Sequence, residues 1–410
     1  MEIKKLRGMA DIVTGGEVDP SQFLKVWDIG REVAEQFGYS YIEPPILEVE
    51  GLFSRSVGES SDIVRKEMYT FADKGGRGVA LRPEGTAGVV RAFIENRLDR
   101  KGGKYRFWYF GPMFRYERPQ KGRYRQFHQF GVEFFGEESP LADVEVIQMG
   151  AEILDRLGIK YRLKLNSLGC PKCSPNYRRE LVQFLEKHRS QLCPDCRERL
   201  EKNPIRTLDC KNPNCREILK YAPILPSHLC EECNSHFRQV KEGLERLNIP
   251  FEEDPRLVRG LDYYTRTAFE FVGVGEGVGA QNAIIGGGRY DRLVEFLGGK
   301  PTPAVGFAVG VERIIPLITT DSKREGVYLG AMVKEGVNLL PLLAHILRKE
   351  GEKVWVEYTP KSLKAHLRSA DKRGVKEVGI LGEEELKKLK EAENLERGEL
   401  KELLWWKVLS

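Results

Sequence analysis

Apolar and polar side chains alternate between residues 110 and 135, on both sides of a short cationic segment. One face of the second half carries an aromatic residue, an amide, a glycine and a carboxylate. These residues are Phe127, Gln129, Gly131 and Glu133. Its other face is mostly apolar and consists of His128, Phe130, Val132 and Phe134. Because neighbouring side chains of a strand point to opposite sides, the pattern predicts a hairpin with one face in the core. The mixed face predicts the floor of a site for a flat polar ligand, with room over the glycine.

The segment between the two predicted strands is rich in positive charge. Its polar residues are Arg118, Gln120, Lys121, Arg123, Tyr124 and Arg125, and Arg115 precedes them. Such a charge density suits phosphates and cannot be buried without anions. A solvated hairpin held by salt bridges is the alternative. The aromatic residues on both strands favour a nucleotide site.

Two patterns precede the hairpin in the chain. The apolar spacing of residues 22–37 predicts an amphipathic helix that ends at Gly38. Residues 39–48 predict a strand broken at Pro44 and Pro45, because proline cannot donate to the hydrogen-bond ladder of a central strand.

Two further segments lead from a strand or turn into a helix. Residues 81–86 predict a turn before a helix that begins near Thr86, so Glu84 falls at the helix start, where a carboxylate favours the helix dipole. Residues 304–315 predict a strand of small residues followed by a helix that bears Glu312 and Arg313.

The last ninety residues follow a different pattern. After a linker at residues 322–326, the apolar runs are 327–333, 354–358 and 378–381, and they alternate with helical segments at 338–349 and 362–373. This order predicts a separate small α/β domain. The second helix has an inner stripe of Leu363, Leu367 and Ala370 and an outer cationic set of Lys361, Lys364, Arg368 and Lys372. Such a set is either a solvated face or a surface for an anion such as RNA.

Composition places the chain among globular proteins of two to three domains. It has 410 residues, of which 41% are hydrophobic and 31% charged, and this excludes a disordered or membrane class. No apolar run is long enough to span a bilayer, and the first residues lack the apolar core of a signal peptide, so we expect a cytoplasmic protein without a membrane partner. The net charge of +5, from 66 basic and 61 acidic residues, does not identify a partner, whereas the local basic clusters point to a polyanion.

All eight cysteines lie between residues 170 and 233, in four close pairs. The pairs are Cys170 and Cys173, Cys193 and Cys196, Cys210 and Cys215, and Cys230 and Cys233. Pairs at this spacing can share one tetrahedral metal, and structural zinc uses them two at a time, so two Zn²⁺ sites are predicted. Disulfides and free buried thiols are the alternatives.

The motifs together resemble one enzyme family over nearly the whole chain. The segment RYERPQKGRYRQFHQFGVE (115–133) is similar to the second signature motif of class II aminoacyl-tRNA synthetases. Its amino-acid sequence resembles that of the bacterial histidyl-tRNA synthetases in particular. LVRGLDYYTRTAFEF (257–271) and IIGGGRYDRL (284–293) resemble peptides of that same family, although three glycines alone are also compatible with a turn. Residues 39–48 resemble the first class motif, which builds the dimer interface, and residues 304–315 the third.

The resemblance implies an α+β fold. It consists of a six-stranded antiparallel sheet flanked by helices, a helical cysteine-rich insertion and a C-terminal α/β anticodon-binding domain. The implied boundaries are 1–169 and 248–320 for the two parts of the catalytic core, 170–247 for the insertion, and 325–410 for the last domain. A homodimer is also implied, and the insertion of the family packs towards the acceptor stem of the tRNA.

The resemblance also implies the activity and its residues. The activity is ATP-dependent ligation of L-histidine to tRNA(His) through histidyl-adenylate, releasing AMP and diphosphate, with Mg²⁺ bridging the phosphates. Catalytic contacts to the α-phosphate are implied for Arg115 and Arg259, and ATP contacts for Arg115, Arg123, Phe127 and Arg313. Histidine contacts are implied for Glu84, Thr86, Gln129, Glu133, Tyr263 and Tyr264. Contacts to tRNA are implied for Arg118, Gln120, Lys364 and Arg368.

Residue chemistry agrees with the assignment of Arg259. A glycine at position 260 would let the backbone approach a ligand beside Arg259, whose guanidinium can span a carboxylate and a phosphate.

A regulatory paralogue that activates ATP phosphoribosyltransferase in histidine synthesis is the alternative function, since it shares the core. A zinc-bearing RNA-binding regulator would explain the cysteines but not the motif-rich core. Retention of Arg259, Gln129 and Glu133 favours the ligase.

Overall fold

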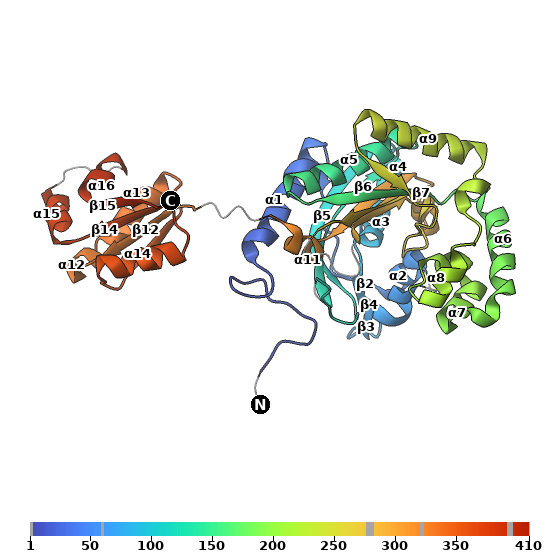
Figure 1. Cartoon of the computed structure of the whole chain (residues 1–410), viewed down its shortest axis with the longest axis horizontal. Coiled ribbons are helices and arrows are strands. Elements are labelled where there is room, and N and C mark those ends of the chain that lie inside the picture. The colour runs from blue at the N-terminus through green and yellow to red at the C-terminus, as the bar shows by residue number, and fades with distance from the viewer. Residues whose placement is uncertain are drawn as a thin grey trace. The chain divides into compact units, whose positions relative to one another are not determined.

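The computed structural model describes residues 3–58, 61–120, 122–275, 283–319, 324–391 and 397–409. Two compact units divide the chain, Met1–Thr319 and Thr320–Ser410 (Figure 1). Lys121 of the predicted cationic loop and part of the predicted linker lie outside the described residues. In the described part of the chain, every helix is too short or too polar to cross a membrane.

The first unit is built on an eight-stranded sheet with the order β1-β5-β6-β11-β10-β9-β7-β8. In that order the strands are Ser40–Tyr41, Tyr105–Phe114, Gln126–Phe135, Ala304–Gly310, Ala283–Arg289, Thr265–Gly273, Tyr161–Ser167 and Phe251–Glu253. The six inner strands pair antiparallel, and the short edge strands β1 and β8 pair parallel. This confirms the antiparallel sheet and adds two edge strands to the six that were predicted.

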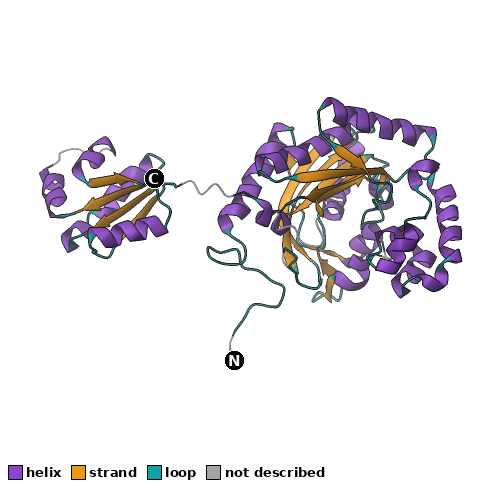
Figure 2. Cartoon of the chain, in the orientation of Figure 1, coloured by secondary structure: helices purple, strands orange, loops and turns teal. Residues whose placement is uncertain are grey.

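The predicted hairpin is formed by β5 and β6, with Tyr109 opposite Gly131. Phe130, Val132 and Phe134 are buried in the main core, as the alternation predicted. Two long helices, α1 (Pro20–Gln36) and α5 (Pro140–Arg156), contribute to the same core and cover this side of the sheet (Figure 2).

The helix predicted at residues 22–37 begins two residues earlier in the structure. Asp19 precedes α1, and its carboxylate accepts a hydrogen bond from the Ser21 backbone N–H at 2.8 Å. Pro20 occupies the first helical position, which needs no backbone donor. The cap and the proline therefore set the helix start.

The strand predicted at residues 39–48 is two strands in different sheets. Its first part is β1 of the main sheet, whereas Leu47–Val49 (β2) joins a three-stranded sheet with β4 (Gly78–Leu81) and β3 (Tyr69–Ala72). The two prolines between them end the pairing of β1. The helical elements in this part of the chain are α2 (Glu50–Val57), a π-helix (Ile63–Glu67), α3 (Thr86–Glu95) and α4 (Leu98–Lys101).

The cysteine-bearing residues of the first unit fold as helices. These are α6 (Ser174–Lys187), α7 (Pro194–Lys202), α8 (Pro213–Leu219) and α9 (Glu231–Arg246), with 3₁₀ turns at Arg189–Gln191, Pro204–Asp209 and Leu225–His228. The first three helices share a small core that includes buried Tyr177, Leu181 and Leu219. By contrast, α9 packs on α5, where Gly243 leaves space for Val144.

The three glycines 286–288 lie inside β10 and do not form a turn. Short helical segments follow the last strands of the sheet: α10 (Leu293–Phe296), α11 (Val311–Ile314) and a 3₁₀ turn at Ile315–Leu317. As predicted, the small-residue strand β11 runs directly into α11.

The second unit has a four-stranded sheet in the order β13-β12-β14-β15. Its strands in that order are Val354–Glu357, Val327–Ala331, Glu377–Leu381 and Trp405–Val408, and its helices are α12 (Lys334–Val337), α13 (Leu340–Lys349), α14 (Leu363–Lys372), α15 (Glu383–Glu391) and α16 (Arg397–Leu403). Only β15 pairs antiparallel. This confirms the predicted α/β pattern.

The outer cationic face of α14 is smaller than predicted. Lys364, Arg368 and Lys372 are exposed, but Lys361 precedes the helix and pairs with Glu357. Sequence reasoning missed His366 on this helix. It is fully buried, with Nδ1 2.9 Å from the Tyr328 hydroxyl and Nε2 2.9 Å from the Ala331 carbonyl oxygen.

Candidate functional site

A cavity in the first unit brings together most of the residues that the sequence selected. The predicted residues on its wall are Glu84, Thr86, Arg115, Arg123, Phe127, Gln129, Arg259, Tyr263, Tyr264 and Arg313. Arg118 and Gln120 are exposed and not on this wall. Lys364 and Arg368 belong to the second unit.

Sheet pairing explains why residues far apart in sequence meet here. Strand β6 carries Phe127 and Gln129 and pairs with β11, so Gln129 lies opposite Gly310. The helix that follows β11 then places Arg313 at the same end of the sheet. On the other side of β11, β10 contributes Gly286 to the wall.

Four arginines face one another across the cavity. Burial, followed by repulsion from Arg123 and Arg115, lowers the pKa of Arg313 to about 10. Glu117 is shared, with oxygens 2.7 Å from Arg123 Nη2 and 3.8 Å from Arg115 Nη1. The fourth arginine, Arg259, pairs with Glu270. Among the described residues, the four guanidinium groups therefore have only two carboxylates as ion-pair partners, Glu117 and Glu270, which favours a bound polyanion.

Arg259 is held between strands. Its Nη1 lies 2.5 Å from Glu270 Oε2, while its Nε is buried without a hydrogen-bond partner. Its guanidinium fits only because Gly286 has no side chain, since a Cβ there would lie 1.6 Å from Nη2. The prediction that Gly260 allows a close approach receives no support from protein atoms, because a Cβ at that position would meet open space.

Arg115 lies next to the ring that was predicted to stack on adenine. Its guanidinium carbon is 5.3 Å from the centre of the Phe127 ring, and its Nε donates to the Pro83 carbonyl oxygen at 2.8 Å. The backbone bond fixes the guanidinium at the mouth of the hairpin, where it faces the cavity.

The start of α3 supplies a buried carboxylate to the cavity. Glu84 accepts hydrogen bonds from the backbone N–H groups of Thr86 at 2.8 Å and Ala87 at 2.9 Å. It therefore serves the helix start, and it also lines the cavity. Burial raises the pKa of Glu84, and the bonds to Ala87 and Thr86 oppose this rise.

Glu133 lies beneath the wall of the cavity. It is 1% exposed, and its carboxylate accepts hydrogen bonds from the Thr86 hydroxyl at 2.7 Å and from the Tyr290 hydroxyl. Burial raises the pKa of Glu133 to about 8, although both hydroxyl bonds act in the opposite direction. The carboxyl group is therefore largely protonated near neutral pH.

The space over Gly131 is filled by protein, which corrects the prediction that a ligand occupies it. A Cβ at position 131 would lie 2.2 Å from Cζ of Tyr109, whose ring also covers Gly85. Sequence reasoning missed Tyr109. The available signal was the pairing itself, because Tyr109 stands directly opposite Gly131 on the same face of the hairpin.

Buried polar atoms without a partner gather around the cavity. Within the described residues, those at the site are Tyr109 Oη, Arg123 Nε, Gln129 Oε1, Arg259 Nε and Tyr263 Oη. Unpaired buried polar atoms are costly, so a cluster of them indicates a polar ligand that pairs with them.

Glu312 anchors the adjacent strand. Its carboxylate accepts a hydrogen bond from the His128 backbone N–H at 2.8 Å, and Oε1 lies 2.7 Å from His128 Nδ1. The sequence singled out Glu312 without giving it a role, and its role here is to fix α11 against β6.

The eight cysteines form two groups of four away from this cavity wall. One group is Cys170, Cys173, Cys230 and Cys233, and the other is Cys193, Cys196, Cys210 and Cys215. All eight are free thiols. In each group the ligand atoms lie within 4.8 Å of one another.

Comparison with known proteins points to one family. The sequence model described as histidyl-tRNA synthetase matches residues 17–314. A protein of a Nitratiruptor species called histidine--tRNA ligase is 56% identical over 386 residues, covering 94% of this chain and 93% of the relative. A protein of Sulfurimonas denitrificans with the same name is 54% identical, covering 94% of each chain. The crystal structure of apo S. aureus histidyl-tRNA synthetase superposes with a TM-score of 0.74 at 35% identity, covering 94% of this chain and 93% of the other.

Proposed function

Because the chain belongs to the histidyl-tRNA synthetase family, an enzyme family of ATP-dependent aminoacylation, we propose that its arginine-rich cavity is where L-histidine and ATP react and where tRNA(His) receives the histidyl group. The observation that carries this proposal is the gathering of four guanidinium groups in one cavity that has the buried carboxyl group of Glu84 on its wall and that of Glu133 beneath it. A polyphosphate and an amino acid need these two environments within one cavity.

In the first step the carboxylate of histidine attacks the α-phosphorus of ATP, giving histidyl-adenylate and diphosphate. Such a displacement depends on positioning and on neutralising charge on the phosphoryl oxygens. Arg115 and Arg259 would grip the α-phosphate, Arg123 and Arg313 the outer phosphates, and Phe127 would stack on adenine. Mg²⁺ carried by ATP would add charge between the phosphates.

ATP would also relieve the repulsion between the guanidinium groups of the cavity. The phosphates would take the place of Glu117 opposite Arg115 and Arg123, and would offer an acceptor to the unpaired Nε atoms of Arg123 and Arg259. They would also reduce the repulsion that lowers the pKa of Arg313.

Histidine would bind on the other side of the cavity. Its ammonium group would approach Glu84 and Thr86, and its imidazole would bond Gln129, Glu133 and Tyr264, with Tyr263 beside it. An apolar amino acid would leave these buried groups unpaired, which is the penalty that gives specificity. The contact to Glu133 requires the imidazole to replace one of the two hydroxyl donors.

In the second step the terminal ribose of tRNA attacks the adenylate and releases AMP. Arg118 and Gln120 are exposed on the hairpin loop and would contact the first base pair. Lys364 and Arg368 are exposed on α14 of the second unit and would contact the anticodon region. The helices of residues 170–247 would face the acceptor stem.

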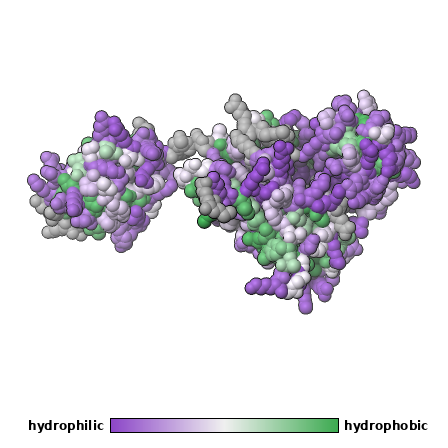
Figure 3. Space-filling view, turned by 90° about the horizontal axis from the view of Figure 1, so that it is seen from below, coloured by the Kyte–Doolittle hydropathy of each residue, from purple (hydrophilic) through white to green (hydrophobic). Residues whose placement is uncertain are grey.

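A homodimer through the segment around β1 and β2 is part of the proposal. Apolar side chains exposed there are Tyr41, Ile46, Leu47, Val49 and, on β3, Phe71. Figure 3 shows apolar surface gathered on one face of the larger unit. A patch of this kind is typical of a protein interface. We place the protein in the cytoplasm, where translation uses its product.

Histidine-dependent exchange between ATP and labelled diphosphate tests the proposed function. We expect exchange with histidine and none without an amino acid, because the adenylate forms reversibly in the first step. A folded protein without exchange would contradict the ligase and favour a regulatory paralogue. Charging of tRNA(His) transcript then tests the second step.

The pKa of Glu133 predicts how histidine binding depends on pH. Because the folded pKa is raised to about 8, the carboxylate that would accept from imidazole becomes available as pH rises through 8. We expect the KM for histidine to fall as pH rises from 7 to 9, and this dependence to vanish in Glu133→Gln, which resembles the protonated form. The KM for ATP serves as control and should change little. A wild-type KM for histidine that does not vary with pH would contradict this assignment.

A further inference from the structure

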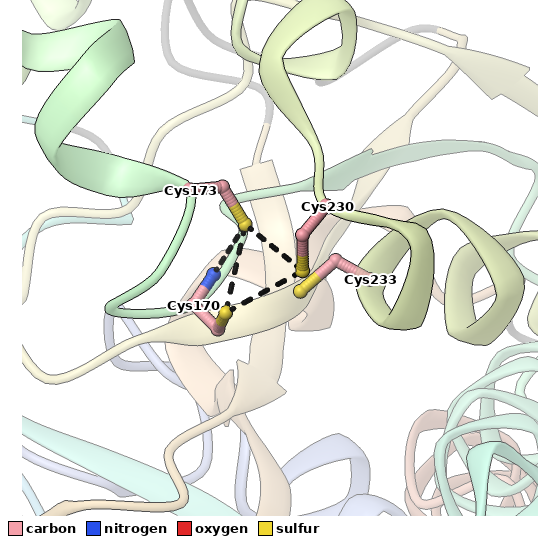
Figure 4. A group of neighbouring side chains, drawn as sticks. All are labelled: Cys170, Cys173, Cys230 and Cys233. Carbon is pink, nitrogen blue, oxygen red and sulfur yellow. Dashed lines mark hydrogen bonds between the residues drawn. The ribbon is translucent and has the colours of Figure 1, made fainter.

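We propose that each group of four cysteines binds one Zn²⁺ ion, so that the chain carries two structural zinc sites outside its catalytic cavity. This inference does not depend on the proposed function, because it rests on the arrangement of the sulfur atoms. The outer site consists of Cys170, Cys173, Cys230 and Cys233 (Figure 4), and the inner site of Cys193, Cys196, Cys210 and Cys215.

The distances between sulfur atoms fit a single ion in both sites. In the outer site Sγ of Cys170 lies 3.5 Å from Cys173 and 3.8 Å from Cys230, and Cys173 lies 3.6 Å from Cys230. In the inner site Cys193 lies 3.8 Å from Cys210. Zinc–sulfur bonds of about 2.3 Å at tetrahedral angles separate the sulfur atoms by about 3.8 Å. These four distances are close to the edges of an S₄ tetrahedron around one ion, and all four sulfur atoms of each site lie within 4.8 Å of one another.

The alternatives explain these distances less well. In a disulfide each sulfur has one bonded partner at about 2.05 Å, whereas Cys170 and Cys173 each have two sulfur neighbours at nearly equal distance. An iron–sulfur cluster of four irons binds each cysteine to a different iron and needs a wider spacing. Four thiols without an ion can share weak S–H···S hydrogen bonds, as between Cys170, Cys173 and Cys230, but such bonds do not require four sulfur atoms to gather around one point. Tetrahedral S₄ coordination of a lone ion by paired cysteines is typical of structural zinc, and metal analysis distinguishes it from a single iron with the same ligands.

Backbone N–H groups point at the sulfur atoms of both sites. The N–H of Cys170 donates to Cys173 Sγ at 3.3 Å, and that of Lys172 to Cys170 Sγ at 3.4 Å. In the inner site the N–H of Cys193 donates to Cys215 Sγ at 3.2 Å, and that of Asn212 to Cys210 Sγ at 3.4 Å. Such donors stabilise thiolate ligands and orient them towards a metal.

Helix starts supply part of the same stabilisation. Cys173 directly precedes α6, Cys193 directly precedes α7, and Cys230 directly precedes α9. The positive end of a helix dipole favours a thiolate over a thiol. Each bound Zn²⁺ would displace four thiol protons, so the ZnS₄ group carries two negative charges that the helix starts and N–H donors offset.

The outer site lies where the helical residues join the sheet. Leu168 and Gly169 link β7 to Cys170, and both bond the backbone of Arg266 at the start of β9, at 2.6 and 2.7 Å. Arg266 adopts a φ of 50°, which is strained for a residue with a side chain, and its Nη1 lies 3.3 Å from His236 Nδ1 on α9. The ion would therefore fix the first and last cysteine pairs at one point on the sheet.

The inner site holds α7 in position against the small-sheet side of the unit. From this helix Arg199 pairs with Asp62 at 3.0 Å, and Glu198 pairs with Arg65 at 2.9 Å. Asp62 directly precedes the π-helix, and Arg65 lies within it. The same π-helix contains Ile63, which lines the catalytic cavity. Loss of the inner ion would release α7 from this contact.

Metal analysis of the purified full chain is the primary test. We expect two zinc ions per chain after purification without chelator. Cys230→Ser and Cys210→Ser should each retain one ion, and the matched control Ser227→Ala, an exposed serine near the outer site, should retain two. Substitution with Co²⁺ should give the absorption of tetrahedral thiolate coordination for two sites per chain.

Thiol reactivity of the wild-type chain keeps the test valid if a cysteine variant fails to fold. We expect the eight thiols to react slowly with a thiol reagent, and quickly after a strong chelator removes the zinc. A metal-free chain whose eight thiols react at once would overturn the inference. A protein mass that shows disulfide bonds would also overturn it, and so would a metal analysis that finds iron in place of zinc.

Discussion

Replacing Arg259 with alanine is expected to lower kcat for histidine-dependent diphosphate exchange by about 10³-fold, the scale on which a single arginine stabilises a phosphoryl-transfer transition state. The guanidinium lies in the cavity wall, where its Nη1 pairs with Glu270 and its buried Nε has no hydrogen-bond partner. Its charge therefore acts at the cavity wall with one carboxylate beside it. Arg259→Lys keeps the charge but loses the planar fork, and it should recover only part of the activity.

A glycine variant separates the position of Arg259 from its presence. In Gly286→Ala the new Cβ would lie 1.6 Å from Arg259 Nη2, so the guanidinium has to leave its site although its charge remains. We expect a loss of kcat of at least about 10²-fold, because misplacement by about 1 Å has this cost. Gly51→Ala is the control, since its Cβ meets no atom within 4 Å. Full activity of both Gly286→Ala and Arg259→Ala would exclude Arg259 from the reaction.

Replacing Arg289 with methionine is expected to destabilise the first unit by about 3–5 kcal/mol, a large share of the stability of an ordinary domain. Arg289 and Asp143 are both fully buried. All donors of the guanidinium are used, on Asp143, Asp291 and the carbonyl oxygens of Glu137 and Ser139. Without Arg289 the Asp143 carboxylate would remain buried beside His236 alone. Thermal and urea unfolding of the first unit measure the effect.

Two comparisons identify the buried charge as the cause. Arg292→Met changes an exposed arginine three residues away and should leave stability nearly unchanged. The double variant Arg289→Met with Asp143→Leu removes both charges and should regain much of the loss, because apolar pairs replace buried ion pairs at little cost. If the double variant were less stable than Arg289→Met, shape and not charge would be responsible.

The same ion pair predicts a response to acid. Burial disfavours the charged form of Asp143, but Arg289, and then His236, outweigh it and lower its pKa to about 2. A lowered folded pKa stabilises the protein above the ordinary pKa of 3.8. This contribution is lost as pH falls from about 4 towards 2.

Local patterns predicted elements well where one face of the chain decides the structure. The alternation of β6 put Phe130 and Val132 in the core, and the spacing of α1 and α14 placed both helices to within two residues. Period-two and helical patterns survive folding because each reflects burial of a single face. Glu84, Arg115 and Arg259 were selected because the family resemblance covers their whole segments.

What the sequence could not supply was contact between distant segments. Tyr109 fills the space over Gly131 from a neighbouring strand, and Gly286 makes room for Arg259 across the sheet. The partition of eight cysteines into two groups depends on how α6–α9 return to β7, which no spacing reveals. The buried pair of Arg289 and Asp143 joins positions 146 residues apart. Each of these depends on tertiary packing that local pattern does not encode.

The order of strands also fixes when this protein can become active during its synthesis. Strand β6 is completed at residue 135, but its partner β11 spans residues 304–310, and Arg313 follows. A nascent chain therefore displays one open, apolar-flanked edge of β6 while more than 160 further residues are translated. A strand edge of this kind invites pairing with other chains. Truncated products that end before β11 should consequently be inert and dependent on chaperones, because a large part of the cavity wall does not yet exist.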